Sequence, residues 1–167
     1  SRRVPPKKET ASLLGVCYDV VEVLVASLAC IVLLFTFLFR VVGVEGDSMM
    51  DTLYGGDRLI LCPALSSPDR GDIVVINRYT DEPLVKRVIG VAGDTLEIDE
   101  ELHRVRLNGE LLDEPYVQYP TPAYDMTGEV AVPEGYVFVM GDHRNDSHDS
   151  RAADIGLVPV DDIVGWA

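Results

Sequence analysis

A serine and a lysine stand out as a pair that could cleave a peptide bond. Gly46 precedes Ser48 by two residues, and a glycine there lets the backbone turn sharply and approach another chain closely. After the apolar segment near the N-terminus, Lys86 is the only lysine, and every other basic residue is arginine. Arginine keeps its proton at working pH, whereas a lysine removed from water can lose it. Lys86 is therefore the one amine that could activate Ser48.

Three interpretations of Ser48 are compatible with the surrounding residue types. The first is a Ser–Lys pair. The second is a Ser–His pair that uses His143 or His148 with one of the aspartates of residues 141–151. In the third, Ser48 is a polar turn residue without a catalytic role. Spacing along the chain does not decide between them, because it does not give the order of the strands.

The local sequence around Lys86 predicts a β-strand. Strand alternation places Lys86 on one face with Leu84 and Val88, and Arg87 on the other face. If the face of Lys86 is turned inward, loss of water lowers its pKa from about 10.4 toward neutrality. If the strand lies at a sheet edge, the amine stays in water and keeps its charge.

Residues 141–151 form a second cluster of polar side chains. This segment holds two serines, three aspartates, two arginines and two histidines, and it follows a strong predicted strand at residues 136–140. Such a segment is either a solvated surface loop or a shell that orients catalytic groups. In the second case, a hydroxyl would aim the lysine and Asp–Arg pairs would hold the loop.

Composition and charge exclude some classes of function. The chain of 167 residues has 14 basic and 28 acidic side chains, for a net charge of −14, which argues against nucleic-acid binding. Residues 41–167 hold 9 of the basic and 25 of the acidic side chains, which indicates an acidic, outward-facing domain. The three cysteines show neither a disulfide framework nor a zinc spacing, so no cofactor or metal is expected.

Hydrophobicity divides the chain into three parts. We expect a basic cytoplasmic tail at residues 1–12, a transmembrane anchor at 13–39 and an extracytoplasmic catalytic β domain at 40–167. The charge-free core of the anchor, residues 23–39, is just long enough to span about 30 Å of hydrocarbon. A cleaved signal peptide and a buried core helix are the alternatives. The basic residues before the anchor place the N-terminus in the cytoplasm.

From residue 41 the pattern of apolar residues becomes that of strands. The fold class is predicted as mainly β, an N-terminal transmembrane helix followed by a folded antiparallel barrel or sandwich. Asn108 and Gly109 predict a hairpin turn, and residues 114–125 an extended loop. The predicted strands are 58–61, 73–77, 84–91, 95–98, 105–107, 136–140, 158–160 and 163–164.

These residues together resemble the type I (leader) signal peptidases, and in particular the compact Gram-positive type. The resemblance covers the anchor and nearly all of residues 40–167, and its motifs follow the family's order at residues 46–49, 70–75, 85–94, 141–151 and 156–165. It implies a single-pass, membrane-bound serine endopeptidase that removes N-terminal signal peptides from exported preproteins outside the cytoplasmic membrane. The alternatives are a catalytically silent, anchored peptide-binding module and a Ser–Lys processing peptidase with few substrates.

The resemblance also implies roles for individual residues. Ser48 matches the nucleophile and the donor of one oxyanion N–H, Lys86 the general base, and Ser147 the hydroxyl that orients the lysine. Gly46 stands where some members have a serine, so a second oxyanion donor must be its N–H or a water. Charged residues that match supporting positions are Arg87, Asp142, Asp149 and Arg151. The substrate groove, which suits small residues at positions −1 and −3, is expected near Val42, Val44, Met49, Leu53 and Val85.

Two positions depart from the family pattern. Asp51 stands where the family usually has a proline, which would fix φ, and it adds a negative charge near the groove. His143 stands where many members have asparagine, and it adds a titratable group. The first departure concerns loop rigidity and substrate preference more than the chemistry.

Overall fold

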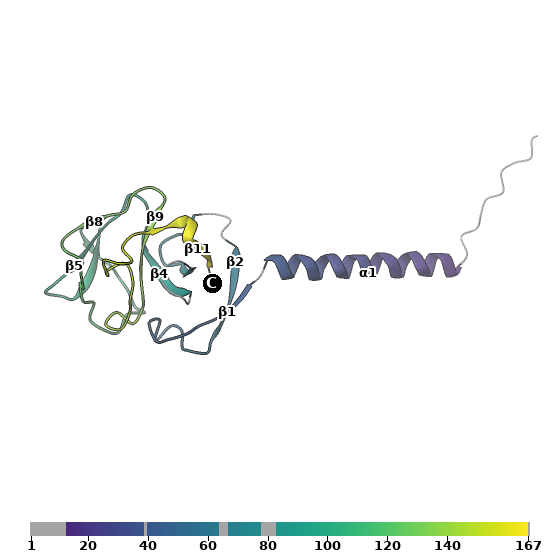
Figure 1. The fold of residues 1–167 in the computed structure, drawn as a ribbon, viewed down its shortest axis with the longest axis horizontal. Helices are drawn as coiled ribbons and strands as arrows, with labels where there is room; N and C mark the ends of the chain where they lie inside the picture. Colours follow the sequence, from purple (N-terminus) through teal and green to yellow (C-terminus); the bar gives the residue numbers. More distant parts are fainter. Residues whose placement is uncertain (1–12, 39, 64–66, 78–82, 167) are drawn as a thin grey trace, which may run out of the picture. The chain divides into compact units, whose positions relative to one another are not determined.

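The computed structural model describes residues 13–38, 40–63, 67–77 and 83–166 (Figure 1). It divides the chain into an N-terminal helical unit, which ends at residue 38, and a β unit that follows it. The mainly β fold with an N-terminal apolar helix, predicted from the sequence, is confirmed.

Helix α1 (Leu13–Leu38) carries Asp19 and Glu22 in its first half and has no charged residue after Glu22. Its segment Leu13–Thr36 has a mean hydropathy of 2.3 and is long and apolar enough to cross a membrane. No part of this window is buried, whereas the core helix of a soluble domain would be. The hydroxyls of Ser27 and Thr36 each donate to the carbonyl four residues earlier at 2.7 Å, so neither needs water as a partner.

The β unit consists of two sheets, whose pairings between described strands are antiparallel. The larger sheet has the order β1 (Arg40–Gly43), β2 (Arg58–Pro63), β11 (Ile163–Trp166), β3 (Ile73–Ile76), β4 (Leu84–Gly90), β9 (Tyr136–Met140) and β10 (Val158–Pro159). The smaller sheet has the order β7 (Glu110–Leu111), β6 (Arg104–Leu107), β5 (Thr95–Asp99) and β8 (Val130–Ala131). A short 3₁₀ helix, η1 (Val160–Asp162), leads into β11.

The predicted strands are present, with ends that shift by one or two residues. Asn108 and Gly109 have φ angles of 52° and 82°, as the two central residues of a type I′ hairpin turn require. This turn joins β6 to β7, so the predicted hairpin is confirmed. The sequence did not reveal β1 or β8. β8 has two residues and β1 directly follows the apolar helix, so neither shows an alternating pattern of its own.

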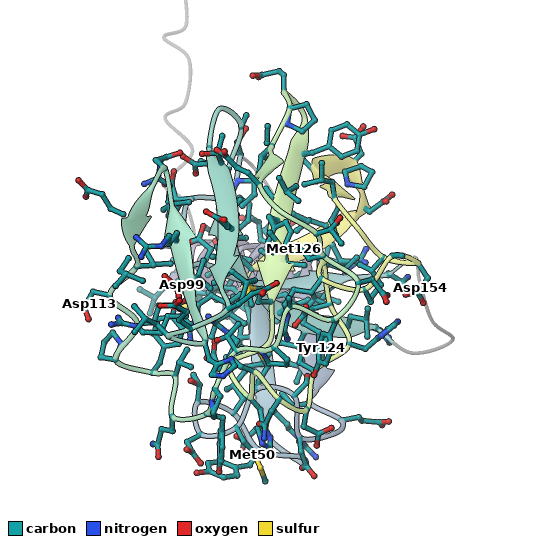
Figure 2. The ribbon with its side chains drawn as sticks, turned by 90° about the vertical axis from the view of Figure 1, so that its left-hand side faces the viewer. Met50, Asp99, Asp113, Tyr124, Met126 and Asp154 are labelled. Carbon is teal, nitrogen blue, oxygen red and sulfur yellow. The ribbon has the colours of Figure 1, made fainter. Side chains whose placement is uncertain are left out.

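Strand β4 contacts every part of the core. Val88 belongs to a cluster between β3, β9 and β11, Ile89 to a cluster with the smaller sheet, and Val85 to a cluster with β2 and the loop after β1. Lys86 lies between these residues and is therefore surrounded by protein. Away from the core, Figure 2 shows Asp113 and Asp154 on opposite flanks of the β unit.

Candidate active site

Ser48 and Lys86 come together from two distant parts of the larger sheet. Ser48 lies in the loop between β1 and β2, and Lys86 lies on β4, with β11 and β3 between these strands. The Nζ atom of Lys86 lies 2.7 Å from the Oγ atom of Ser48. The lysine is only 3% exposed. This geometry allows the direct transfer of a proton from the hydroxyl to a neutral amine.

Burial changes the acidity of Lys86. It lowers the pKa of the ammonium group from 10.5 to about 8, against the attraction of Asp149 and Asp142 and with the repulsion of Arg151. At pH 8 about half of the molecules therefore carry a neutral amine, which is the form that a general base requires.

The carboxylate of Asp149 is the common hydrogen-bond acceptor for several groups beside Lys86. Its carboxylate accepts hydrogen bonds from Ser147 Oγ at 2.7 Å, from the Gly141 N–H at 3.0 Å, and from Nε and Nη2 of Arg151 at 2.8 and 2.7 Å. Burial alone would raise the pKa of Asp149, but its bonds to Arg151, Gly141 and Ser147 hold that pKa below its usual range. Among the described hydrogen bonds, the Ser147 hydroxyl donates to Asp149 and none joins it to Lys86.

Gly141 separates the two serines of the site. A β-carbon at this position would lie 2.2 Å from Ser147 Oγ and 2.4 Å from the carbonyl oxygen of Ser48. The backbone on both sides is held, since Gly141 donates to Asp149 and accepts from Arg144 Nε at 2.9 Å. Only glycine fits here, a requirement that sequence reasoning missed because both contacts are made across the fold.

Gly141→Ala is expected to lower the cleavage rate by at least about tenfold and the free energy of unfolding by about 1–3 kcal/mol, because the added methyl group overfills the site. Steady-state cleavage and urea unfolding would measure the two effects. Gly109→Ala, in the β6–β7 turn, strains a positive φ but meets no neighbour within 4 Å, so it controls for loss of stability without a clash at the site. An active, stable Gly141→Ala would contradict the tight packing.

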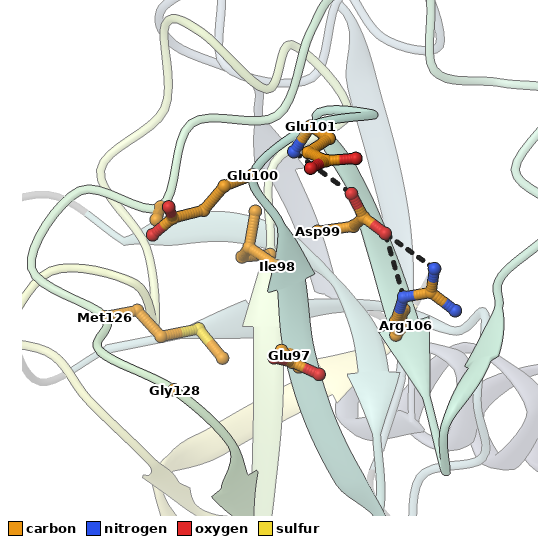
Figure 3. A pocket seen from close by; sticks show the side chains of 9 residues that line it. Glu97, Ile98, Asp99, Glu100, Glu101, Arg106, Met126 and Gly128 are labelled. Atoms are coloured by element: carbon orange, nitrogen blue, oxygen red, sulfur yellow. Dashed lines mark hydrogen bonds and ion pairs between the residues drawn. The ribbon is translucent and has the colours of Figure 1, made fainter.

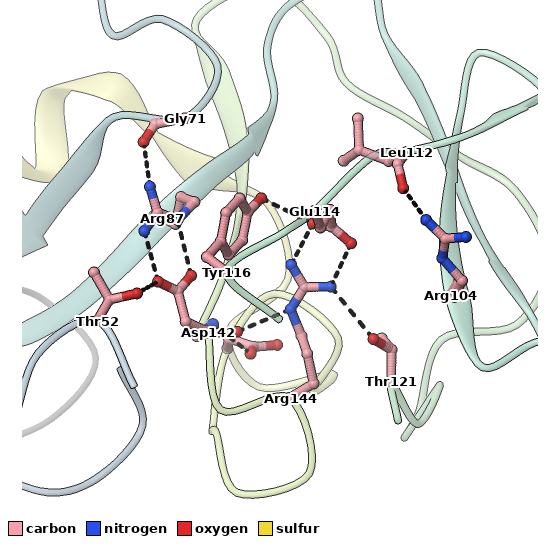
Figure 4. A network of polar contacts seen from close by, with 12 residues as sticks. Thr52, Gly71, Arg87, Arg104, Leu112, Glu114, Tyr116, Thr121, Asp142 and Arg144 are labelled. Carbon is pink, nitrogen blue, oxygen red and sulfur yellow. Dashed lines mark hydrogen bonds and ion pairs between the residues drawn. The ribbon is translucent and has the colours of Figure 1, made fainter. Parts of the chain in front are cut away.

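A second polar network ties the Ser48 loop to residues 141–151 (Figure 4). Asp142 is fully buried and accepts two hydrogen bonds from Arg87, Nε–Oδ1 at 2.8 Å and Nη2–Oδ2 at 2.6 Å. Thr52 Oγ1 donates to Asp142 Oδ2 at 2.6 Å. Thr52 was not singled out from the sequence. Through it, the loop that holds the serine is fastened to the strand that holds the lysine.

The network continues into residues 114–121, which the sequence indicated only as part of an extended loop. The Arg87 guanidinium lies 4.1 Å above the ring of Tyr116, whose hydroxyl donates to Glu114 at 2.9 Å. Glu114 also pairs with Arg144, which is completely buried and bonds Thr121. Burial and the neighbouring charge of Glu114 raise the pKa of Tyr116. The loop is thus held against the site by charged and aromatic contacts.

The two histidines of residues 141–151 have partners other than the serine hydroxyl. His143 Nδ1 lies 3.1 Å from the carbonyl oxygen of Asp47, and His148 Nε2 lies 2.8 Å from Asp154. Among the described contacts, neither ring bonds Ser48 Oγ. Of the two catalytic arrangements that the sequence left open, the structure brings together the serine and the lysine.

The five residues expected to line a groove lie in one apolar cluster beside Ser48. Val44, Met49 and Val85 are buried, and Val42 and Leu53 are partly exposed at the edge of the cluster. Of these five residues, only Val42 and Leu53 are therefore partly accessible to a substrate.

Another group of clustered carboxylates lies away from Ser48 and Lys86. A hollow of about 380 Å³ beside β5 is lined in part by Glu97, Asp99, Glu100 and Glu101. Figure 3 shows these side chains from close by. None of its lining residues belongs to the Ser48 and Lys86 site, and Asp99 is occupied by Arg106 at 2.9 and 2.6 Å. In the part of the chain that the structure describes, no group of His, Cys, Asp and Glu could hold a metal ion.

A half-buried serine in contact with a buried lysine, on a mainly antiparallel β fold, is the arrangement expected of a serine hydrolase. The family model described as signal peptidase, peptidase S26, matches residues 17–167. The chain belongs to this family, and with it to the serine peptidases.

Individual relatives of the chain also carry the name signal peptidase I. The chain is 36% identical over 156 residues to "Signal peptidase I" of Bacillus amyloliquefaciens, covering 86% of this chain and 79% of the relative. It is 34% identical over 171 residues to "Signal peptidase I S" of Bacillus subtilis (strain 168), covering 95% and 91%. The crystal structure of a signal peptidase I from Enterococcus faecalis V583 matches with a TM-score of 0.50 and 28% identity, over 61% of this chain and 97% of that one. These likenesses do not favour a catalytically silent module.

Proposed function

We propose that this chain is a membrane-anchored serine endopeptidase that removes N-terminal signal peptides from exported preproteins, with Ser48 as nucleophile and Lys86 as general base. The observation that carries the proposal is the 2.7 Å contact between Lys86 Nζ and Ser48 Oγ, made by a lysine that is 3% exposed. The signal peptidase family of the chain supports the choice of substrate.

The proposed reaction needs only groups of this chain and a water molecule. Neutral Lys86 accepts the proton of Ser48 Oγ, and the oxygen attacks the carbonyl carbon of residue −1. The Ser48 N–H, with the Gly46 N–H or a water as second donor, holds the oxyanion, and one good donor contributes about 3–4 kcal/mol. The Lys86 ammonium then protonates the leaving amine. Water hydrolyses the acyl-enzyme, again with Lys86 as base.

The surrounding charged residues support this chemistry by position. Asp149 and Arg151 hold Ser147 and Gly141 beside the dyad. Arg87 and Asp142 fix Thr52 and thereby the loop of the nucleophile. Each of these charged side chains is paired with an opposite charge, Arg87 with Asp142 and Arg151 with Asp149.

The substrate is proposed to bind as an extended strand whose small residues at −1 and −3 face the apolar cluster. In the described sheet β1 is an edge strand, so backbone groups along its outer side are open for pairing with another chain. Small side chains suit an apolar cluster that is mostly buried. The proposed contacts are Val42, Val44, Met49, Leu53 and Val85.

The membrane arrangement belongs to the same proposal. Residues 13–39 form a single-pass anchor in the lipid bilayer and residues 40–167 the extracytoplasmic catalytic domain. Residues 1–12, which lie outside the described residues, would form the basic cytoplasmic tail. The span Leu13–Thr36 supports the anchor by length and hydropathy. A shared membrane raises the effective concentration of the enzyme and its preprotein for one another.

The test is cleavage of a reporter peptide with alanine at −1 and −3 by the full chain in detergent. We expect kcat/KM to rise with pH through one ionisation near 8, because the lowered pKa of Lys86 sets the fraction of neutral base. Ser48→Ala should abolish cleavage. Normal cleavage by Ser48→Ala, or a rate that falls as pH rises from 7 to 9, would contradict the proposal.

A further inference from the structure

We propose that the imidazole of His143 is a positioning residue for the oxyanion site, acting through the peptide bond between Asp47 and Ser48. This inference rests on the proposed role of the Ser48 N–H as oxyanion donor. Nδ1 of His143 lies 3.1 Å from the Asp47 carbonyl oxygen. A carbonyl oxygen only accepts, so Nδ1 carries the hydrogen and donates it.

The planarity of the peptide unit links this contact to the oxyanion site. The Asp47 carbonyl and the Ser48 N–H belong to the same rigid trans unit and point in opposite directions. A donor that fixes the carbonyl therefore also fixes the direction of the N–H. Hydrogen bonding to the carbonyl polarises the unit as well, and this strengthens the N–H as a donor.

The next peptide unit is held by the same residue. The backbone N–H of His143 donates to the Ser48 carbonyl oxygen at 3.0 Å. The Asp47 carbonyl also accepts from the Met50 N–H at 3.1 Å, so the imidazole adds a second donor to a carbonyl that is already part of a turn. Both peptide units that flank the nucleophile are thus attached to His143.

This arrangement would fix the direction of the Ser48 N–H. Within the described residues, no backbone or side-chain group accepts a hydrogen bond from the Ser48 N–H. The imidazole itself is held in place, because the ring of Tyr119 lies 4.4 Å from it, centroid to centroid, with a tilt of 35°. One face of the ring is therefore covered by a side chain of the loop at residues 114–121.

The proposed role has a kinetic signature. Full negative charge appears on the oxyanion only in the transition state, so its support affects kcat and leaves substrate binding nearly unchanged. A peptide aldehyde of the substrate sequence probes the same site. Ser48 Oγ adds to its carbonyl carbon, the π electron pair moves to the oxygen, and Lys86 takes the hydroxyl proton.

Three variants of His143 and one control test the inference in the full chain. His143→Ala removes the ring. The amide nitrogen of His143→Asn can take the place of Nδ1 and donate to Asp47, whereas that of His143→Gln reaches the place of Nε2 and cannot. His148→Ala is the control, since the His148 side chain is about half exposed and pairs with exposed Asp154. Unfolding in urea, followed by the fluorescence of Trp166, shows whether each variant is folded.

We expect His143→Ala and His143→Gln to lower kcat about 10- to 100-fold and to change KM less than twofold. The affinity of these variants for the peptide aldehyde should fall by a factor similar to that in kcat. His143→Asn should stay within about threefold of the wild type, and His148→Ala should match it. The ionisation near pH 8 should persist in all four, because Lys86 is intact.

Equal losses in the Asn and Gln variants, or a loss confined to KM, would overturn the inference. So would a fall in kcat without weaker binding of the aldehyde. If His143→Ala does not fold, the comparison of Asn with Gln still decides. Wild-type kinetics in all His143 variants, with Ser48→Ala inactive, would remove this inference alone. Cleavage by Ser48→Ala would instead remove the proposed function.

Discussion

Replacing Lys86 with methionine is expected to abolish cleavage and to stabilise the folded protein below pH 8. Methionine has nearly the length of lysine but no proton-accepting nitrogen, so Ser48 loses its base. Removing one member of a catalytic serine site costs about 10⁴-fold or more in kcat. The remaining rate would come from substrate binding and the oxyanion site alone.

The gain in stability follows from the cost of burying the charge. The pKa of Lys86 falls from 10.5 to about 8 on folding, which corresponds to roughly 3 kcal/mol at 1.36 kcal/mol per unit. Between pH 8 and 10.5 the unfolded chain binds more protons at this site than the folded one, so wild-type stability rises with pH in that window. The advantage of Lys86→Met is therefore complete below pH 8 and disappears above 10.5.

Urea unfolding at pH 6.5 and pH 10.5, followed by the fluorescence of Trp166, measures this difference. Arg58→Met is a suitable control, because it removes a positive charge from an exposed position on β2 and should change stability by less than about 0.5 kcal/mol. If Lys86→Met were less stable than the wild type at pH 6.5, the ammonium group would not be desolvated as its burial indicates.

Asp149→Asn is expected to destabilise the protein strongly while lowering the pH at which it becomes active. Arg151 is 1% exposed and donates three hydrogen bonds to Asp149, two of them from its guanidinium. An amide leaves this buried charge uncompensated, which typically costs about 3–5 kcal/mol. Asp149 also raises the pKa of Lys86, so its neutralisation moves the ionisation in kcat/KM below 8.

The measurement is a pH profile of kcat/KM at low temperature, where the weakened variant stays folded, with urea unfolding beside it. Asp154→Asn provides the matched control. Its carboxylate is 69% exposed and pairs with His148, so both stability and the pH profile should remain unchanged. An ionisation that moved upward in Asp149→Asn would mean that this carboxylate does not act on Lys86.

The sequence predicted the type of catalytic site, but not the tertiary contacts that bring its residues together. Lys86 could be singled out because the acidic domain has no other lysine, and the ordered motifs indicated the family. The contact with Ser48 could not be predicted, since β11 and β3 lie between the two strands concerned. Which of Lys86, His143 and His148 contacts the serine hydroxyl depends on that strand order and on the path of the loop after β9.

The residues that were missed act through tertiary contacts. Thr52 bonds Asp142 across 90 positions of sequence, and a side chain on Gly141 would meet Ser48 and Ser147. Tyr116 touches Arg87 from a loop without regular structure. No local periodicity or composition signals such contacts, whereas the Asn108–Gly109 hairpin is local and was predicted correctly.

The position of β11 has a consequence for the timing of activity. This strand is the last in sequence among the described elements, yet it lies between β2 and β3. Ser48 belongs to the β1–β2 side of β11, and Lys86 lies on β4, on the other side. A growing chain that still lacks residues 163–166 therefore has both reactive groups but cannot join them. The peptidase is expected to remain inert during its own synthesis until β11 has been made and inserted into the sheet.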